Sequence, residues 1–193
     1  MNILNKLKDM GVEFKIQKSK LIMFLIFAIG ICCMSILSVE PICLWKVVAA
    51  LIACFGVCFI NLKLSKLWYT VCAELILIIA AVTCYVVTEL IYFSTIRFEA
   101  WSLFINALAM YALAKLVYAL FLNLTLSVFV PLLMSYVFSV AAYYVLLFRG
   151  TPLLPWDITA ISTAATVADN FIYVIPKMFV YALVICALAI LMT

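Results

Sequence analysis

The sequence predicts an all-α polytopic membrane protein, a helical bundle of about six transmembrane helices with one short interfacial helix. Of its 193 residues, 71% are hydrophobic and only 10% are charged, whereas soluble domains are about half apolar and about a quarter charged. A soluble globule of this size exposes roughly a third of its chain surface and could not hide so much apolar area. The apolar residues also occur in long runs, close to the roughly 20 residues that a helix needs to cross a bilayer. A soluble globular protein, a disordered chain and a nucleic-acid binder are therefore excluded.

Six apolar runs meet the length requirement for a spanning helix or nearly meet it. They comprise residues 21–39, 42–60, 67–93, 101–122, 124–148 and 176–192. Each run is apolar on every face, whereas a membrane β-strand alternates over about 10 residues, so helices are favoured over barrel strands. The first run is longer than a signal-peptide core and lacks a small-residue cleavage pattern after it, so a retained helix is expected. We expect a basic N-terminal segment at 1–20, followed by one transmembrane domain at 21–193.

The distribution of basic residues predicts that the N-terminus is cytoplasmic. Residues 1–20 carry five lysines against two acidic residues, and the short loop at 61–66 carries two lysines and no acidic residue. Positively charged loops stay on the cytoplasmic side of a membrane. Two spans separate these two stretches, so both belong on the same side. Alternation of the later spans then predicts that the loop at 149–175 lies outside the cell.

The absence of histidine narrows the possible chemistry. Histidine is the commonest general acid or base and a frequent metal ligand, so Ser-His-Asp, Cys-His and His-metal sites are excluded. The eight cysteines form no C-x-x-C pair, and nearly all lie inside apolar runs. They are expected to be small side chains at helix contacts rather than disulfides or metal ligands. No catalytic or metal-binding residue is predicted.

Four charged side chains lie in or near the apolar runs, namely Lys46, Glu74, Glu89 and Lys115. A charge at the bilayer centre costs at least about 2.5–3.5 kcal/mol on insertion scales, so each needs a reason to be there. One interpretation is structural: Glu74 pairs with Lys115 near the inner face, and Glu89 pairs with Lys46 near the outer face. The other is functional, an ion or proton path or a pocket for a polar lipid head. The structural interpretation is favoured, because a proton path usually needs ionisable groups at stepped depths.

The loop at 149–175 has the most chemical character. Gly150, Pro152 and Pro155 disfavour helix where the loop begins. Asp157 is suited to cap a short helix over 158–168, because its carboxylate can accept a free backbone N–H. One face of that helix is apolar and the other carries hydroxyl groups, so we expect it to lie on the outer membrane surface or to re-enter the bundle.

Arg149 falls at the depth of lipid phosphate groups, and arginine binds phosphate through two N–H donors. One interpretation is contact with an anionic lipid head, or docking of an outer domain. The other is an interfacial anchor in which Arg149 pairs with Asp157. The candidate lipid-head or domain-docking loop comprises Arg149, Gly150, Thr151, Pro152, Pro155, Trp156 and Asp157.

Residues 148–157 read FRGTPLLPWD, and Thr163, Ala164, Val167 and Asn170 follow. This stretch resembles the membrane part of lipoteichoic acid synthase-like proteins, which are phosphoglycerol transferases of the sulfatase/alkaline phosphatase superfamily from Gram-positive bacteria. Many members carry R-G-T-P-x-x-P-x-D followed by a T-A-x-x-V helix between two membrane helices. The resemblance implies a multi-pass protein of the bacterial cell membrane with this loop outside the cell.

The resemblance also implies a large extracellular catalytic domain, with a Thr nucleophile and a divalent metal, usually manganese, held by acidic and His residues. The chain ends at Thr193 and has no His, so no catalytic or metal-binding residue carries over to it. We therefore expect a fragment or stand-alone membrane domain that has no cofactor and is inactive alone. The expected partners are membrane lipids, including an anionic glycerophospholipid, and an extracellular catalytic domain.

The predicted function is the membrane-anchor and lipid-presenting part of such a transferase, in the synthesis of a cell-envelope polymer. Two alternatives remain open. One is a small transporter or lipid-handling membrane protein that uses Glu74 and Glu89. The other is a non-catalytic membrane scaffold for envelope enzymes.

Overall fold

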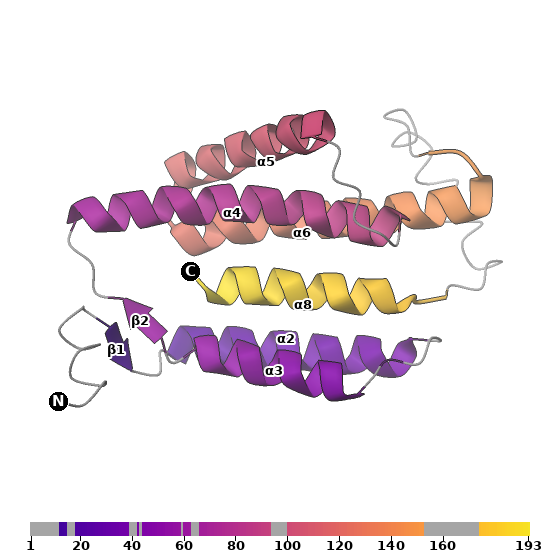
Figure 1. Ribbon diagram of the computed structural model, residues 1–193, viewed down its shortest axis with the longest axis horizontal. Helices are drawn as coiled ribbons and strands as arrows, with labels where there is room; N and C mark the ends of the chain where they lie inside the picture. The colour runs from indigo at the N-terminus through magenta and orange to yellow at the C-terminus, as the bar shows by residue number, and fades with distance from the viewer. Residues whose placement is uncertain are drawn as a thin grey trace.

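The computed structural model confirms an all-α bundle. It describes residues 12–14, 18–38, 42, 44–58, 60–62, 66–93, 100–152 and 174–193. Within these residues the helices are α2 (Lys18–Leu37), α3 (Leu44–Val57), α4 (Lys66–Phe93), α5 (Ala100–Phe121), α6 (Leu124–Arg149) and α8 (Lys177–Leu191). They run alternately in opposite directions, so the start of α2 and the end of α8 lie at the same end of the bundle (Figure 1).

Four helices, α2, α4, α5 and α6, are long and apolar enough to cross a membrane, which supports a membrane location. The remaining two are shorter than the apolar runs at 42–60 and 176–192 predicted. With 14 and 15 residues, α3 and α8 are about 21 and 22 Å long, against a hydrocarbon core of about 30 Å. The run at 42–60 loses its last residue to a β-strand, and Pro176 has an extended backbone, so α8 begins only at Lys177.

Two short strands were not predicted. β1 (Val12–Phe14) pairs antiparallel with β2 (Ile60–Leu62), with Val12 opposite Leu62 and Phe14 opposite Ile60. The pair joins the N-terminal segment to the connection between α3 and α4, at the end of the bundle where the chain begins (Figure 1). Strands of three residues are too short to give a recognisable alternating pattern, which needs about 4–8 residues.

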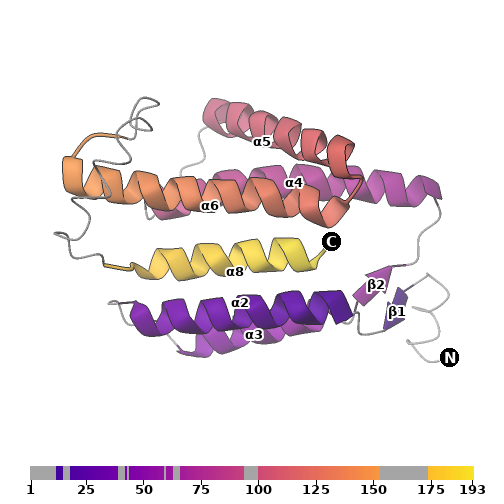
Figure 2. The same ribbon diagram turned by 180° about the vertical axis from the view of Figure 1, so that it is seen from behind.

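Helix α8 is the centre of the bundle. It packs against α2 and α3 on one side and against α4 and α6 on the other, while α5 packs against α4 and α6; Figures 1 and 2 show this order from opposite sides. Phe179 and Cys186 of α8 belong to the core shared with α4 and α6, whereas Val180 and Ala187 belong to the core shared with α2 and α3. A helix that is apolar all round is expected to be buried, and α8 is buried on two faces.

Small polar side chains hold α6 against its neighbours. Ser127, Ser135 and Ser139 are buried on α6. The Ser139 hydroxyl donates to the Ser135 carbonyl (2.5 Å) and lies 3.2 Å from Oγ1 of Thr88 on α4. Small residues let helix backbones approach closely in lipid, where the hydrophobic effect does not drive helices together. These serines therefore mark the closely packed face of α6.

Candidate functional site

The site that the sequence singled out begins where α6 ends. Gly150 follows Arg149 with a φ of 72°, and its N–H donates to the Leu146 carbonyl over 2.9 Å. This left-handed conformation is available to glycine without a steric penalty and is a common helix stop. The predicted interruption of helix at Gly150 is therefore confirmed. Arg149 is exposed in the last turn of α6, where a cation is favoured by the helix dipole.

The chain on the far side of the loop is fixed to the same end of the bundle. The Tyr144 hydroxyl on α6 donates to the Val174 carbonyl (2.9 Å), just before α8. Ile175 forms an isolated parallel bridge with Ser38, just after α2. The chain entering α8 is therefore held between the C-terminal ends of α6 and α2.

An aromatic cluster lies beneath this junction. The rings of Tyr143 and Tyr144 both meet the Phe179 ring edge-on, with centroids 5.2 and 5.8 Å away, and Tyr144 stacks on Phe148 at 5.9 Å. Edge-to-face pairs at such separations are favourable, and tyrosine is enriched where a membrane meets water. We call these four rings the aromatic platform; Arg149 follows Phe148, one of its members, directly in the chain.

The structure does not place the whole predicted loop. Thr151 and Pro152 follow Gly150 as exposed, non-helical residues. Pro155, Trp156 and Asp157 lie outside the described residues, as do the predicted helix at 158–168 and the predicted pair of Arg149 with Asp157.

The predicted pair of Glu74 with Lys115 is confirmed. Nζ of Lys115 on α5 lies 2.5 Å from Oε1 of Glu74 on α4, and the Tyr111 hydroxyl donates to the other carboxylate oxygen over 2.8 Å. Both charged side chains are 39% exposed. Sequence reasoning missed Tyr111, although it lies four residues before Lys115 and so on the same side of α5. We call Glu74, Tyr111 and Lys115 the polar cluster.

The predicted pair of Lys46 with Glu89 is wrong. Nζ of Lys46 on α3 lies 5.8 Å from the centre of the Tyr181 ring on α8, a separation typical of cation–π contacts. Glu89 is buried on α4. Because α8 packs between α3 and α4, Lys46 and Glu89 lie on opposite sides of it although their depths are similar.

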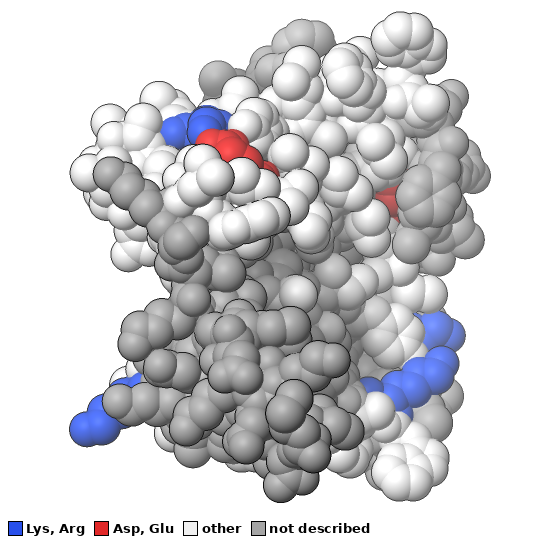
Figure 3. Space-filling model, turned by 60° about the vertical axis from the view of Figure 1, so that its left-hand side comes forward, with Lys and Arg blue, Asp and Glu red and all other residues white. Residues whose placement is uncertain are grey.

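Few charged side chains appear on the face of the molecule in Figure 3; the rest of its described surface is uncharged.

Four cysteines serve helix packing, as predicted, whereas Cys32 and Cys33 on α2 are exposed and make the prediction wrong for these two. Cys54 and Cys58 are buried in the core of α2, α3 and α8, and Cys84 and Cys186 are buried in the core of α4, α6 and α8. The Cys58 thiol donates to the Cys54 carbonyl over 3.4 Å. Among the described residues, no group of three or more Cys, Asp or Glu side chains could hold a metal ion.

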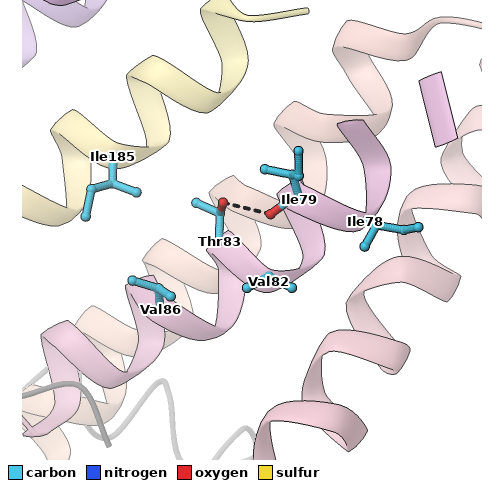
Figure 4. Close-up of a pocket in the computed structure, with 6 residues that line it drawn as sticks. All are labelled: Ile78, Ile79, Val82, Thr83, Val86 and Ile185. Atoms are coloured by element: carbon cyan, nitrogen blue, oxygen red, sulfur yellow. Dashed lines mark hydrogen bonds between the residues drawn. The ribbon is translucent and has the colours of Figure 1, made fainter. Parts of the chain in front are cut away.

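Sequence reasoning also missed a groove between α4 and α8. It has a volume of about 240 Å³ (Figure 4). The Thr83 hydroxyl donates to the Ile79 carbonyl over 2.8 Å, so the one polar side chain in its lining is already satisfied. We call it the α4–α8 groove; its lining comprises Ile78, Ile79, Val82, Thr83, Val86 and Ile185.

Comparison of the chain with protein-family models, with curated proteins and with solved structures gives no match.

Proposed function

We propose that the chain is the membrane part of a lipoteichoic acid synthase-like phosphoglycerol transferase and presents a lipid-linked phosphoglycerol donor outside the cell. The observation that carries the proposal is the position of FRGTPLLPWD at 148–157, which begins at the end of α6 with a member of the aromatic platform. Arg149 opens this stretch and is exposed. Catalysis would belong to an extracellular domain that works with this chain.

The chemistry of the junction suits an anionic lipid head. A guanidinium can donate two parallel N–H bonds to a phosphate. The rings of Tyr143, Tyr144 and Phe148 belong to the last turns of the same helix, and amphipathic aromatic rings are favoured at head-group level. The bond from Tyr144 to Val174 keeps the chain returning from the loop at the same place. A phosphoglycerol head would therefore meet a cation at the end of α6 while its chains contact apolar surface.

The contacts of Glu74 favour this proposal over a transporter. Both carboxylate oxygens already accept a bond from α5. A group that carries an ion or proton across a membrane has to exchange its partners, whereas an ion pair completed by a hydroxyl donor is typical of a structural contact. Transport by the wild-type chain that disappears in a folded Glu89→Gln variant would instead support the transporter.

The test is retention of phosphatidylglycerol by the purified chain, measured by native mass spectrometry in detergent. We expect Arg149→Ala to weaken the retention of one bound lipid about tenfold, as loss of a charge-assisted bond predicts, and Arg149→Lys to keep part of it. Lys18→Ala, an exposed cation at the opposite end of the bundle, is the matched control and should bind like the wild type. Unchanged retention in Arg149→Ala would contradict the proposal.

A further inference from the structure

One strip along α4 joins the polar cluster to the α4–α8 groove. Glu74, Ile78, Val82 and Val86 succeed one another at intervals of four residues, so each lies beside the next along a ridge that winds gradually around the helix. Glu74 begins the row and is held by Tyr111 and Lys115. The next three members line the groove (Figure 4). Polar and apolar surfaces are therefore continuous along α4.

This strip begins near one membrane interface and runs through the middle of the bilayer. With 28 residues, α4 is about 42 Å long, so about 6 Å of it extends beyond each side of a hydrocarbon core of about 30 Å. Glu74 lies eight residues after Lys66, about 12 Å along the helix and thus about 6 Å inside the core boundary. The groove continues from there to the middle of the bilayer and beyond. A polar group near the interface is thus followed by a slot that points inward.

The ammonium group of Lys115 has more hydrogen-bond donors than its contact with Glu74 uses. An ammonium group carries three N–H donors, and one of those of Lys115 is donated to Oε1 of Glu74. Its side chain is 39% exposed. Unsatisfied donors are costly in hydrocarbon, and a lysine at this depth can extend its ammonium toward the interface. The natural acceptors there are the phosphate and ester oxygens of a lipid.

The groove lining favours an acyl chain over another helix. Close helix contacts in lipid use small residues such as Gly, Ala and Ser. The groove is lined by isoleucine, valine and one threonine, whose branched side chains leave an apolar slot between α4 and α8. A flexible hydrocarbon chain can enter such a slot, whereas the backbone of a helix cannot approach it.

We propose that this strip binds one glycerophospholipid, from the leaflet at the end of the bundle where the chain begins. Lys115 contacts its phosphate, and one acyl chain occupies the α4–α8 groove. The site is independent of the proposed function, because Arg149 lies at the opposite end of the bundle. It would make a membrane lipid part of the contact between α4, α5 and α8.

Titration of the purified full chain, in an Arg149→Ala background, with dioleoylphosphatidylglycerol tests the proposal by native mass spectrometry. We expect one lipid to be retained, about tenfold more weakly in Lys115→Met and nearly unchanged in Lys115→Arg. Dioleoylglycerol, which lacks the phosphate, should bind about tenfold more weakly. Glycerol phosphate, which lacks the chains, should not compete. Retention that is indifferent to Lys115→Met, or equal for the two lipids, overturns the proposal.

Two further comparisons separate lipid binding from helix packing. Val82→Trp fills the groove and should abolish retention, whereas Leu108→Trp, at an exposed position on α5, should leave it unchanged. Glu74→Gln breaks the ion pair but keeps the Lys115 cation, so retention should persist or increase. Equal losses in Glu74→Gln and Lys115→Met would assign the effect to the contact between α4 and α5 and would overturn the proposal.

Discussion

Lys115 and Glu74 join α5 to α4 through an Nζ–Oε1 contact of 2.5 Å, inside two helices that are otherwise almost wholly apolar. Burial of apolar side chains contributes little to holding α5 in place, because Ala114 and Val117 are its two buried residues. In lipid, apolar surface on α5 is solvated as well by acyl chains as by protein. The polar cluster therefore supplies specificity to a helix contact that apolar burial supports only weakly.

We predict that Lys115→Ala destabilises the bundle by about 1–3 kcal/mol, since it removes the cation and leaves a carboxylate unpaired. The double variant Glu74→Gln with Lys115→Ala should recover part of the loss, because no unpaired charge remains. Unfolding in detergent across the double-mutant cycle measures the coupling. Additive losses would mean that the two side chains do not interact.

Gly150→Ala and Gly56→Ala should differ in sign. A Cβ at either position meets no atom within 4 Å, so only backbone conformation separates them. Gly150 has a φ of 72°, which costs alanine about 1–2 kcal/mol. Gly56 lies within α3, where alanine is favoured over glycine by up to about 1 kcal/mol. Thermal unfolding of the two variants should thus shift in opposite directions, and shifts of the same sign would refute this.

Helix α8 should tolerate no added volume. Ala182 is fully buried in the core of α4, α6 and α8, so Ala182→Leu should cost about 1–3 kcal/mol through overpacking. Ala109→Leu is the matched control, because Ala109 is exposed on α5. Chemical unfolding in detergent should separate the two variants; equal stabilities would place α8 elsewhere than at the centre.

The hydrogen bond from the Tyr144 hydroxyl to the Val174 carbonyl should stabilise the chain just before α8. Tyr144→Phe keeps the ring contacts but removes the hydroxyl donor, so a loss of about 1 kcal/mol is expected, with faster proteolysis between Pro152 and Val174. Tyr143→Phe serves as control, since Tyr143 contributes ring contacts to the same cluster. Identical cleavage rates in both variants would rule out this role for the hydroxyl.

Cysteine labelling tests the orientation in the membrane. In a variant without native cysteines, Thr151→Cys should react with an impermeant reagent added outside intact cells, and Ser65→Cys should react only after lysis. The expectation follows from the basic residues at 1–20 and 61–66, which favour the cytoplasmic side. The reverse pattern would invert the predicted topology.

Parts of the candidate site could be read from residue types alone. The stop at Gly150 follows from a glycine between a long apolar run and two prolines, and the depth of Glu74 and Lys115 follows from counting residues along their helices. Tyr111 could have been found four residues from Lys115 on the same helix face. The α4–α8 groove could not, because it requires Ile185 to face α4, and nothing in an apolar run indicates which helix its side chains will meet.

Length and hydrophobicity predict the membrane class, the runs that become helices and the axial depth of each charged residue, because they govern how a chain crosses a bilayer. The lateral neighbours of each helix are seen only in the assembled bundle. Lys46 and Glu89 have similar depths yet lie on opposite sides of α8, while Glu74 and Lys115 meet directly. The reason is that runs apolar on every face carry no stripe to direct packing. The shape of the helix surfaces, small residues and a few polar contacts then determine which helices pack together. These contacts form only when the helices assemble.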